Sequence, residues 1–237
     1  MQKETNLDAV KNTAISFLHL EPERANGEFG DLFVIHPVLE TNMTFLKGTN
    51  EFFNIFEDSE KYKIWLSDMT KYFRHCSSAL NILVSIRKSY RITFFKYVNK
   101  YLSSEDFALL LKNAWITTEN ISDDANVSMK ELVKWFKMAD KEYLLDEEES
   151  KLLSELPNGV SIYRGVRSED YKYGMSWTLS LEKAKWFAAR FDTDTQIVYK
   201  AVIQKQDILA YINERGEQEI IIDPVVLKKY SIEEIEL

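Results

Sequence analysis

The chain of 237 residues has few of the residues that form disulfides or hold metals. It contains a single cysteine, Cys76, and three histidines, His19, His36 and His75. One cysteine excludes an internal disulfide and a cysteine-rich zinc site. The three histidines are scattered and lack the spacing of metal ligands. We therefore expect no metal in the mechanism.

Long apolar runs are also missing. No stretch approaches the roughly 18 apolar residues that a membrane-spanning helix needs, and residues 2–6 are polar. We expect neither a membrane span nor a secretory signal, and hence a cytoplasmic protein. Nothing repeats, and the hydrophobic content of 45% is enough for one large domain or two small ones.

Charge is distributed unevenly along the chain. The total is −8, but residues 61–101 hold nine lysines and arginines against one acid, Asp68. That stretch is therefore +8, which leaves −16 for the rest. Aromatic residues are interleaved with the basic ones, a composition that suits binding of nucleic acid or another polyanion. We favour the alternative, in which the aromatic side chains lie on buried helix faces and the lysine side chains are exposed to solvent.

The order of the predicted elements indicates an α+β fold. Apolar spacing and capping residues predict helices over 62–73, 103–115, 128–139 and 146–156. Alternation predicts strands over 160–166, 175–179, 196–204, 218–222 and part of 225–236, with one helix over 181–191; residues 24–31 look like a loop. Helices first and strands later predict a helical N-terminal region, 1–103, packed on a second region, 104–237, whose strand core is 160–237.

Two glutamates near the C-terminus suit chemistry at a glycosidic centre. Glu217 and Glu219 are two residues apart in a β-branched run, so alternation along a strand would point both carboxylates to one face. One carboxylate could stabilise a cationic, oxocarbenium-like transition state while the other handles a proton. A solvated edge strand with two surface glutamates is the simpler interpretation of this pattern when it is taken alone.

Two further short pieces precede the glutamates. Arg164 lies in Tyr163-Arg164-Gly165, where a forked guanidinium can grip a diphosphate and Gly165 would let a ligand approach the backbone. In Ser176-Trp177-Thr178 the two hydroxyls share one strand face and the tryptophan takes the other. Taken alone, the first piece is also typical of a surface arginine. The second is also typical of a core tryptophan between two surface hydroxyls.

The three pieces together, in this order and within 56 residues, resemble the Arg–Ser–Glu signature of the mono-ADP-ribosyltransferases. The segment Ala184 to Arg190, which reads Ala-x-x-Phe-Ala-x-Arg after Ser-Trp-Thr, is similar to phage and bacterial members, including anti-CRISPR transferases. The resemblance covers residues 160–237 well, 104–159 loosely and the first 100 hardly at all. It implies a split β-sheet core of the transferase type for the second region.

The resemblance implies that NAD⁺ is a substrate and that no metal is needed. By motif, Arg164 with Gly165 would hold the NAD⁺ phosphates, and Ser176 would orient Glu219. Glu219 would contact the nicotinamide ribose and support the oxocarbenium ion. Glu217 would ready an arginine acceptor.

Three more residues are candidates for contact with NAD⁺, namely Thr178, Phe187 and Arg190. An aromatic ring here could stack on nicotinamide, and Arg190 could help to bind phosphate. For the neighbouring Trp186 we favour packing between helix and sheet, and for Phe187 such packing is an equal alternative. The sequence departs from the family at Trp177, where many toxins have threonine, and in the short loop 211–216, which in the family selects the acceptor.

Three functions remain open at this point. The first is transfer of ADP-ribose to a protein side chain, arginine among them, by a bacterial toxin or a phage-encoded modifier of a host or defence protein. Such a protein would have an antitoxin or inhibitor as a partner. The second is transfer to an RNA or DNA base, with residues 61–101 guiding the polymer. The third is a non-catalytic interaction module with the same fold.

Overall fold

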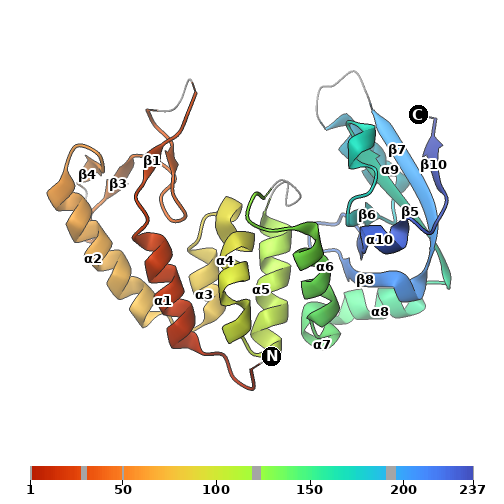
Figure 1. The fold of residues 1–237 in the computed structure, drawn as a ribbon, viewed down its shortest axis with the longest axis horizontal. Helices are drawn as coiled ribbons and strands as arrows, with labels where there is room; N and C mark the ends of the chain where they lie inside the picture. Colours follow the sequence, from red (N-terminus) through yellow and green to blue (C-terminus); the bar gives the residue numbers. More distant parts are fainter. Residues whose placement is uncertain (1, 28–30, 50, 119–123, 191–195, 237) are drawn as a thin grey trace. The chain divides into compact units, whose positions relative to one another are not determined.

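The structure, a computed structural model, describes residues 2–27, 31–49, 51–118, 124–190 and 196–236 (Figure 1). The chain forms two compact units, unit 1 (Met1–Val127) and unit 2 (Ser128–Leu237). The expected boundary at residue 103 falls inside unit 1. The reason is that the helix beginning at Ser104 packs against helices that come earlier in the chain.

Unit 1 is built mainly from helices whose starts are fixed by side-chain caps. Asp58 and Ser103 accept backbone amide protons at the starts of two of them. Figure 1 shows α1, α3, α4 and α5 side by side, and their apolar faces form the core of the unit. The helices are α1 (Leu7–Leu18), α2 (Ser59–His75), α3 (Ala79–Val84), α4 (Arg91–Val98) and α5 (Ser104–Thr117), with the short 3-10 helices η1 (Lys88–Tyr90) and η2 (Asn99–Tyr101) on either side of α4.

Unit 1 also contains two small β-ribbons that do not correspond to any predicted element. They are β1 (Glu23–Arg24) with β2 (Val34–Ile35), and β3 (Met43–Phe45) with β4 (Phe52–Asn54), both antiparallel. Strands of two or three residues are too short to show alternation, which is why they escaped prediction. The expected loop at 24–31 therefore begins inside β1, and its residues 28–30 lie outside the described residues.

Unit 2 begins with helices and continues as a sheet, as predicted. Ser128 and Asp146 form capping boxes with Glu131 and Glu149, and Ser180 caps the helix that follows the Ser-Trp-Thr strand. The helices are α6 (Met129–Met138), α7 (Lys141–Leu144), α8 (Glu147–Glu155), α9 (Leu181–Ala189) and α10 (Pro224–Leu227), with 3-10 turns η4 (Glu169–Tyr171) and η5 (Lys205–Asp207). Residue 191, the expected end of α9, lies outside the described residues.

The sheet of unit 2 has six strands in the order β10-β7-β5-β6-β9-β8, with every neighbouring pair antiparallel. One strand, β8, is not among the predicted strands, and only its last two residues, 211 and 212, fall in the predicted loop 211–216. Elsewhere the prediction matches to within two residues, except that the region 225–236 contains α10 before its strand. The strands are β5 (Gly159–Val166), β6 (Ser176–Thr178), β7 (Ile197–Gln204), β8 (Ile208–Ile212), β9 (Glu219–Ile222) and β10 (Ile232–Ile235).

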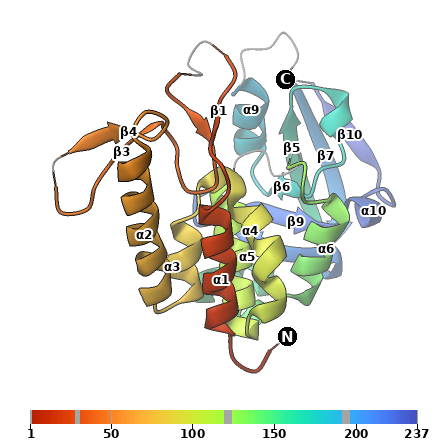
Figure 2. The same ribbon diagram turned by 60° about the vertical axis from the view of Figure 1, so that its left-hand side comes forward.

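The two faces of this sheet carry different apolar clusters. On one face a large core gathers around Trp177, Tyr199 and Tyr211, with side chains of α8 and α10 packed against it. On the other face Ala184 and Ala188 of α9 pack against Val198, beside β5 and β7 (Figure 2). Small residues on α9 let the helix lie close to the sheet. Unit 2 is therefore a mixed helix-and-sheet unit whose sheet is covered on both faces.

Candidate functional site

The three short pieces singled out in the sequence come together on adjacent strands. Tyr163 of β5 pairs with Thr178 of β6, and Thr178 pairs with Glu219 of β9. Residues directly opposite each other in a sheet point to the same face, so these three side chains form a row across it. Segments separated by more than 30 residues in the chain therefore meet at one place in the sheet.

Glu219 is the acidic group at the centre of this site. It is the first residue of β9 and is only 6% exposed. Ser176 pairs with Ile221, two residues further along β9, so its side chain leaves β6 on the same face as that of Glu219. The hydroxyl of Ser176 makes no hydrogen bond to any described residue. Its expected role of orienting Glu219 stays a prediction.

The argument that alternation aligns the two glutamates was wrong. β9 begins at Glu219, and Gln218 has a left-handed backbone with φ of +49°, so strand geometry does not extend back to Glu217. Oε2 of Glu217 lies 2.7 Å from Nη2 of Arg215, and the side chain of Glu217 is 20% exposed. One carboxylate is therefore buried in the sheet, while the other is ion-paired within the hairpin.

A chain of hydrogen bonds fixes the turn that carries the glutamates. Oε1 of Glu149, from α8, accepts the backbone N–H of Asn213 at 2.8 Å, and Oδ1 of Asn213 accepts the N–H of Gln218 at 3.0 Å. Thr178 donates its hydroxyl to the carbonyl of Glu217 at 2.7 Å. This hydroxyl also accepts the N–H of Ser180, so Thr178 shapes the turn and does not present a free hydroxyl to NAD⁺.

Sequence reasoning missed Glu149 and Asn213. The sequence does signal a capping role for Glu149, because it stands three residues after Asp146 at a helix start. Nothing in that local pattern shows that the same carboxylate reaches a backbone amide 64 residues further along the chain. That contact depends on where α8 packs against β8.

Arg164 lies against the segment that leads into β6. Its Nε donates to the carbonyl of Tyr171 at 2.9 Å, and its Nη1 donates to the carbonyl of Ser176. Gly174 gives it room, since a Cβ there would lie 2.3 Å from Nη2. Burial lowers the pKa of Arg164 to about 10, and the charge of Glu219 opposes that shift. Nη2 has no hydrogen-bond partner among the described residues, so its two N–H groups are left for an anion.

The close packing of α9 against β5 requires a glycine at position 165. A Cβ on it would lie 1.8 Å from the carbonyl oxygen of Ala184 and 2.6 Å from the amide of Ala188. The backbone of α9 therefore occupies the side of Gly165 that was expected to admit a ligand. The glycine lets α9 sit directly on β5.

The aromatic residues of α9 differ in exposure. Trp186 is 55% exposed, so the expected packing of this side chain between helix and sheet was wrong. Phe187 is half-buried and meets the Trp186 ring edge-on, at 5.0 Å between centroids. Arg190, the last residue before the segment that the structure does not describe, has its guanidinium 5.8 Å from the same ring centroid. Phe187 and Arg190 remain candidates for contact with NAD⁺.

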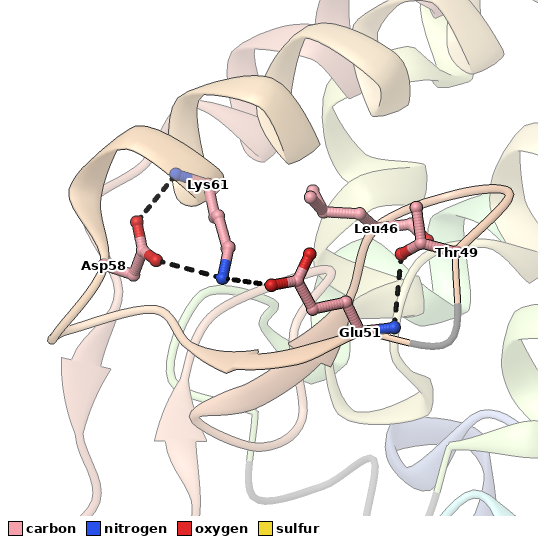
Figure 3. Close-up of polar contacts among 5 residues, drawn as sticks. All are labelled: Leu46, Thr49, Glu51, Asp58 and Lys61. Atoms are coloured by element: carbon pink, nitrogen blue, oxygen red, sulfur yellow. Dashed lines mark hydrogen bonds and ion pairs between the residues drawn. The ribbon is translucent and has the colours of Figure 1, made fainter.

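Much of the basic stretch 61–101 is used inside unit 1. Nζ of Lys61 binds Glu51 at 2.6 Å and lies 3.4 Å from Asp58, which ties α2 to the β3–β4 ribbon (Figure 3). Lys63 and Lys71 each pair with an acid three residues earlier on α2. These lysines are neutralised locally, so they add little to a track for a polyanion.

Two arginines of this stretch bind backbone carbonyls. Arg91 is 9% exposed and donates to the carbonyls of Ile86 and Val84, near the C-terminus of α3. Nη1 of Arg87 donates to the carbonyls of Val34, His36 and Leu39. Both guanidinium groups hold unit 1 together. Neither is placed as a solvated contact for phosphate.

The described residues bring no three side chains of the metal-binding types into one cluster. Within the same residues, no helix has the length and apolar character to cross a membrane. We compared the chain with protein-family models, with curated proteins and with solved structures, and none of them matches it.

Proposed function

We propose that unit 2 is an NAD⁺-dependent mono-ADP-ribosyltransferase that acts on a protein side chain. The observation that carries the proposal is the row Tyr163–Thr178–Glu219, because it makes the strands of Arg164, Ser176 and Glu219 neighbours in the sheet. The buried charge of Glu219 and the partly unsatisfied guanidinium of Arg164 support it, because the substrate develops a cation on its ribose and carries a diphosphate.

In this proposal Glu219 stabilises the oxocarbenium ion that forms when nicotinamide leaves. The bond between C1′ of the ribose and the nicotinamide nitrogen breaks, and nicotinamide takes the electron pair. The acceptor nucleophile then bonds to C1′ and gives its proton to the carboxylate of Glu217. A charged group in a desolvated site is worth more than in water, which is why Glu219 has the larger role.

The salt bridge between Arg215 and Glu217 bears on the acceptor. A guanidinium with a pKa above about 12 needs a base beside it before it becomes a nucleophile. Glu217 already holds one guanidinium at hydrogen-bond distance. The side chain is thus suited to holding an acceptor arginine, which would first have to displace Arg215.

The test is nicotinamide release and transfer of label from NAD⁺ in a bacterial lysate. Glu219→Gln should lower both by about 10²-fold or more, because the charge opposite the developing cation is lost. Glu233→Gln, an exposed glutamate on β10 of the same sheet, is the matched control and should keep full activity. Unchanged release in Glu219→Gln would remove this residue from the chemistry.

The nature of the labelled product separates the three candidate functions. A label that is lost with protease and survives nuclease identifies a protein acceptor, and the reverse identifies a nucleic acid. A folded wild-type chain that neither binds nor consumes NAD⁺ would point to a non-catalytic module. We expect the protease-sensitive label.

A further inference from the structure

A groove runs along unit 1 between α1 and the helical segment 88–101. Its volume is about 680 Å³. One wall comes from α1 and the residues after it, and the other from η1, α4 and η2. The lining residues are Ala9, Asn12, Thr13, Ser16, Phe17, Leu20, Pro37, Tyr90, Thr93, Tyr97, Tyr101 and Asn126.

The two walls differ in chemistry. Tyr90, Tyr97 and Tyr101 are seven and four residues apart, so they follow one face of the helical segment at steps of about 10 and 6 Å. None of their hydroxyls makes a hydrogen bond to a described residue. The facing wall offers the amide of Asn12 and the hydroxyl of Ser16, which donates to the carbonyl of Asn12 and can still accept. One wall therefore presents three tyrosine rings, and the other combines these polar groups with the apolar side chains of Phe17 and Leu20.

Two lysines touch residues of the groove. Lys96 donates to the carbonyl of Asn126, and Nζ of Lys100 lies 4.9 Å from the ring centroid of Tyr101. One carboxylate, that of Asp124, also reaches the wall, where it accepts the hydroxyl of Thr93 and is thereby engaged. At Tyr90 the charges of Arg87 and Glu23 oppose each other, so the cationic end of the groove is the one beside Tyr101 and Lys100.

We propose that this groove binds single-stranded nucleic acid. Bases stack on tyrosine rings whatever their sequence, and lysines follow the phosphates. Steps of about 10 and 6 Å correspond to two or three stacked nucleotides at about 3.4 Å each. Among the described residues, no acidic side chain lines this groove, and its cations, Lys96 and Lys100, lie beside the lining residues Asn126 and Tyr101. Rings next to cations suit bases on a phosphate backbone. The proposal does not depend on the activity of unit 2.

The test is fluorescence anisotropy with a labelled RNA or DNA strand of about eight nucleotides at low salt. Tyr97→Ala and Tyr101→Ala should each weaken binding about 10-fold or more, as expected for the loss of one stacked base. Tyr72→Ala is the control, since Tyr72 is exposed on α2 of the same unit and lies outside the groove. Its affinity should equal that of the wild type.

A second variant at position 97 controls for loss of structure. The ring of Tyr97 packs edge-on against Phe17 at 5.7 Å, so alanine at 97 could loosen α1. Tyr97→Phe keeps the ring and should keep most of the affinity. Lys100→Gln should reduce the salt dependence of binding by about one counterion, while Lys63→Gln, paired with Glu60, should not.

Three results would overturn the proposal. The first is no binding of the strand by the wild-type chain at low salt. The second is equal affinity in Tyr97→Ala, Tyr101→Ala and the wild type. The third is competition by free adenosine monophosphate as strong as that by the strand, which would make the groove a site for a single nucleotide.

Discussion

Arg91 of unit 1 and Arg164 of unit 2 are both desolvated arginines that donate to backbone carbonyls. They differ in whether a guanidinium nitrogen remains without a hydrogen-bond partner. All three guanidinium nitrogens of Arg91 are engaged, because Nη1 also lies 3.5 Å from Oδ1 of Asn113. Arg164 uses Nε and Nη1 and leaves Nη2 without a described partner. Burial lowers the pKa of both. An arginine with all three nitrogens engaged is structural, whereas one with a spare nitrogen and the charge of Glu219 acting on it suits a ligand.

Replacing each of the two arginines by lysine is the most direct test of this difference. Arg164→Lys keeps the charge but loses the fork, so NAD⁺ affinity should fall about 10- to 100-fold, the range for hydrogen bonds to a charged group. Arg91→Lys should leave NAD⁺ affinity unchanged and lower the free energy of unfolding by about 2–4 kcal/mol, since buried carbonyls lose their donors. Calorimetry with NAD⁺ and urea unfolding measure the two effects.

Equal NAD⁺ affinity in the wild type and Arg164→Lys would place Arg164 with Arg91 as a structural residue.

The buried position of Arg91 also limits which variants can test the basic stretch 61–101. Reversing Arg91 to glutamate would put an unpaired charge into the core of unit 1, so loss of nucleic-acid binding in such a variant would report unfolding. Lys96 and Lys100, which touch the groove, are the informative positions.

Two glycines at opposite ends of β5 give a second, smaller contrast. Gly165→Ala would drive a methyl group into the backbone of α9, so the free energy of unfolding should fall by about 1–3 kcal/mol. Gly159→Ala meets only Cγ1 of Val202, at 3.7 Å, and should change stability by less than about 0.5 kcal/mol. Urea unfolding of the two variants checks this. Equal stability would mean that α9 can shift freely on the sheet.

The smallest expected effect is the pH response of unit 1 at His36. Burial holds the pKa of His36 below its usual 6.5, and its Nδ1 accepts the amides of Val38 and Leu39. The unfolded chain binds a proton near pH 6.5 and the folded chain only at lower pH. Stability is therefore complete above about 6.5 and declines as pH falls toward the folded pKa, by at most about 1.4 kcal/mol per pH unit.

Amide hydrogen exchange of Val38 and Leu39 measures this response. Their protection, corrected for the intrinsic effect of pH on exchange, should fall between about pH 7 and pH 5. His75→Gln, at an exposed histidine of α2, is the control and should leave the pH response unchanged. Constant protection over this range would show that His36 is not coupled to the stability of the segment.

Local patterns predicted five of the ten α-helices (α2, α5, α6, α8 and α9) and five of the ten strands (β5, β6, β7, β9 and β10) among the described residues. The capping residues Ser128, Asp146 and Ser180 each start a helix where expected, because a cap needs only a side chain and the amides two or three residues later. The long strands β5 and β7 were predicted from their alternation. The short ribbons of unit 1 were missed, since their pairing depends on contacts and not on a repeated pattern.

The sequence alone predicted Arg164, Ser176 and Glu219 as candidate site residues, through the resemblance of their three strands to a family signature. Only the tertiary structure decided how those residues are held. The left-handed Gln218, the contact from Glu149 to Asn213 and the spare donor of Arg164 all depend on segments that meet only when the sheet of unit 2 assembles. Strand alternation is a property of one segment, whereas burial, pairing and the lowered pKa of Arg164 come from what packs around it.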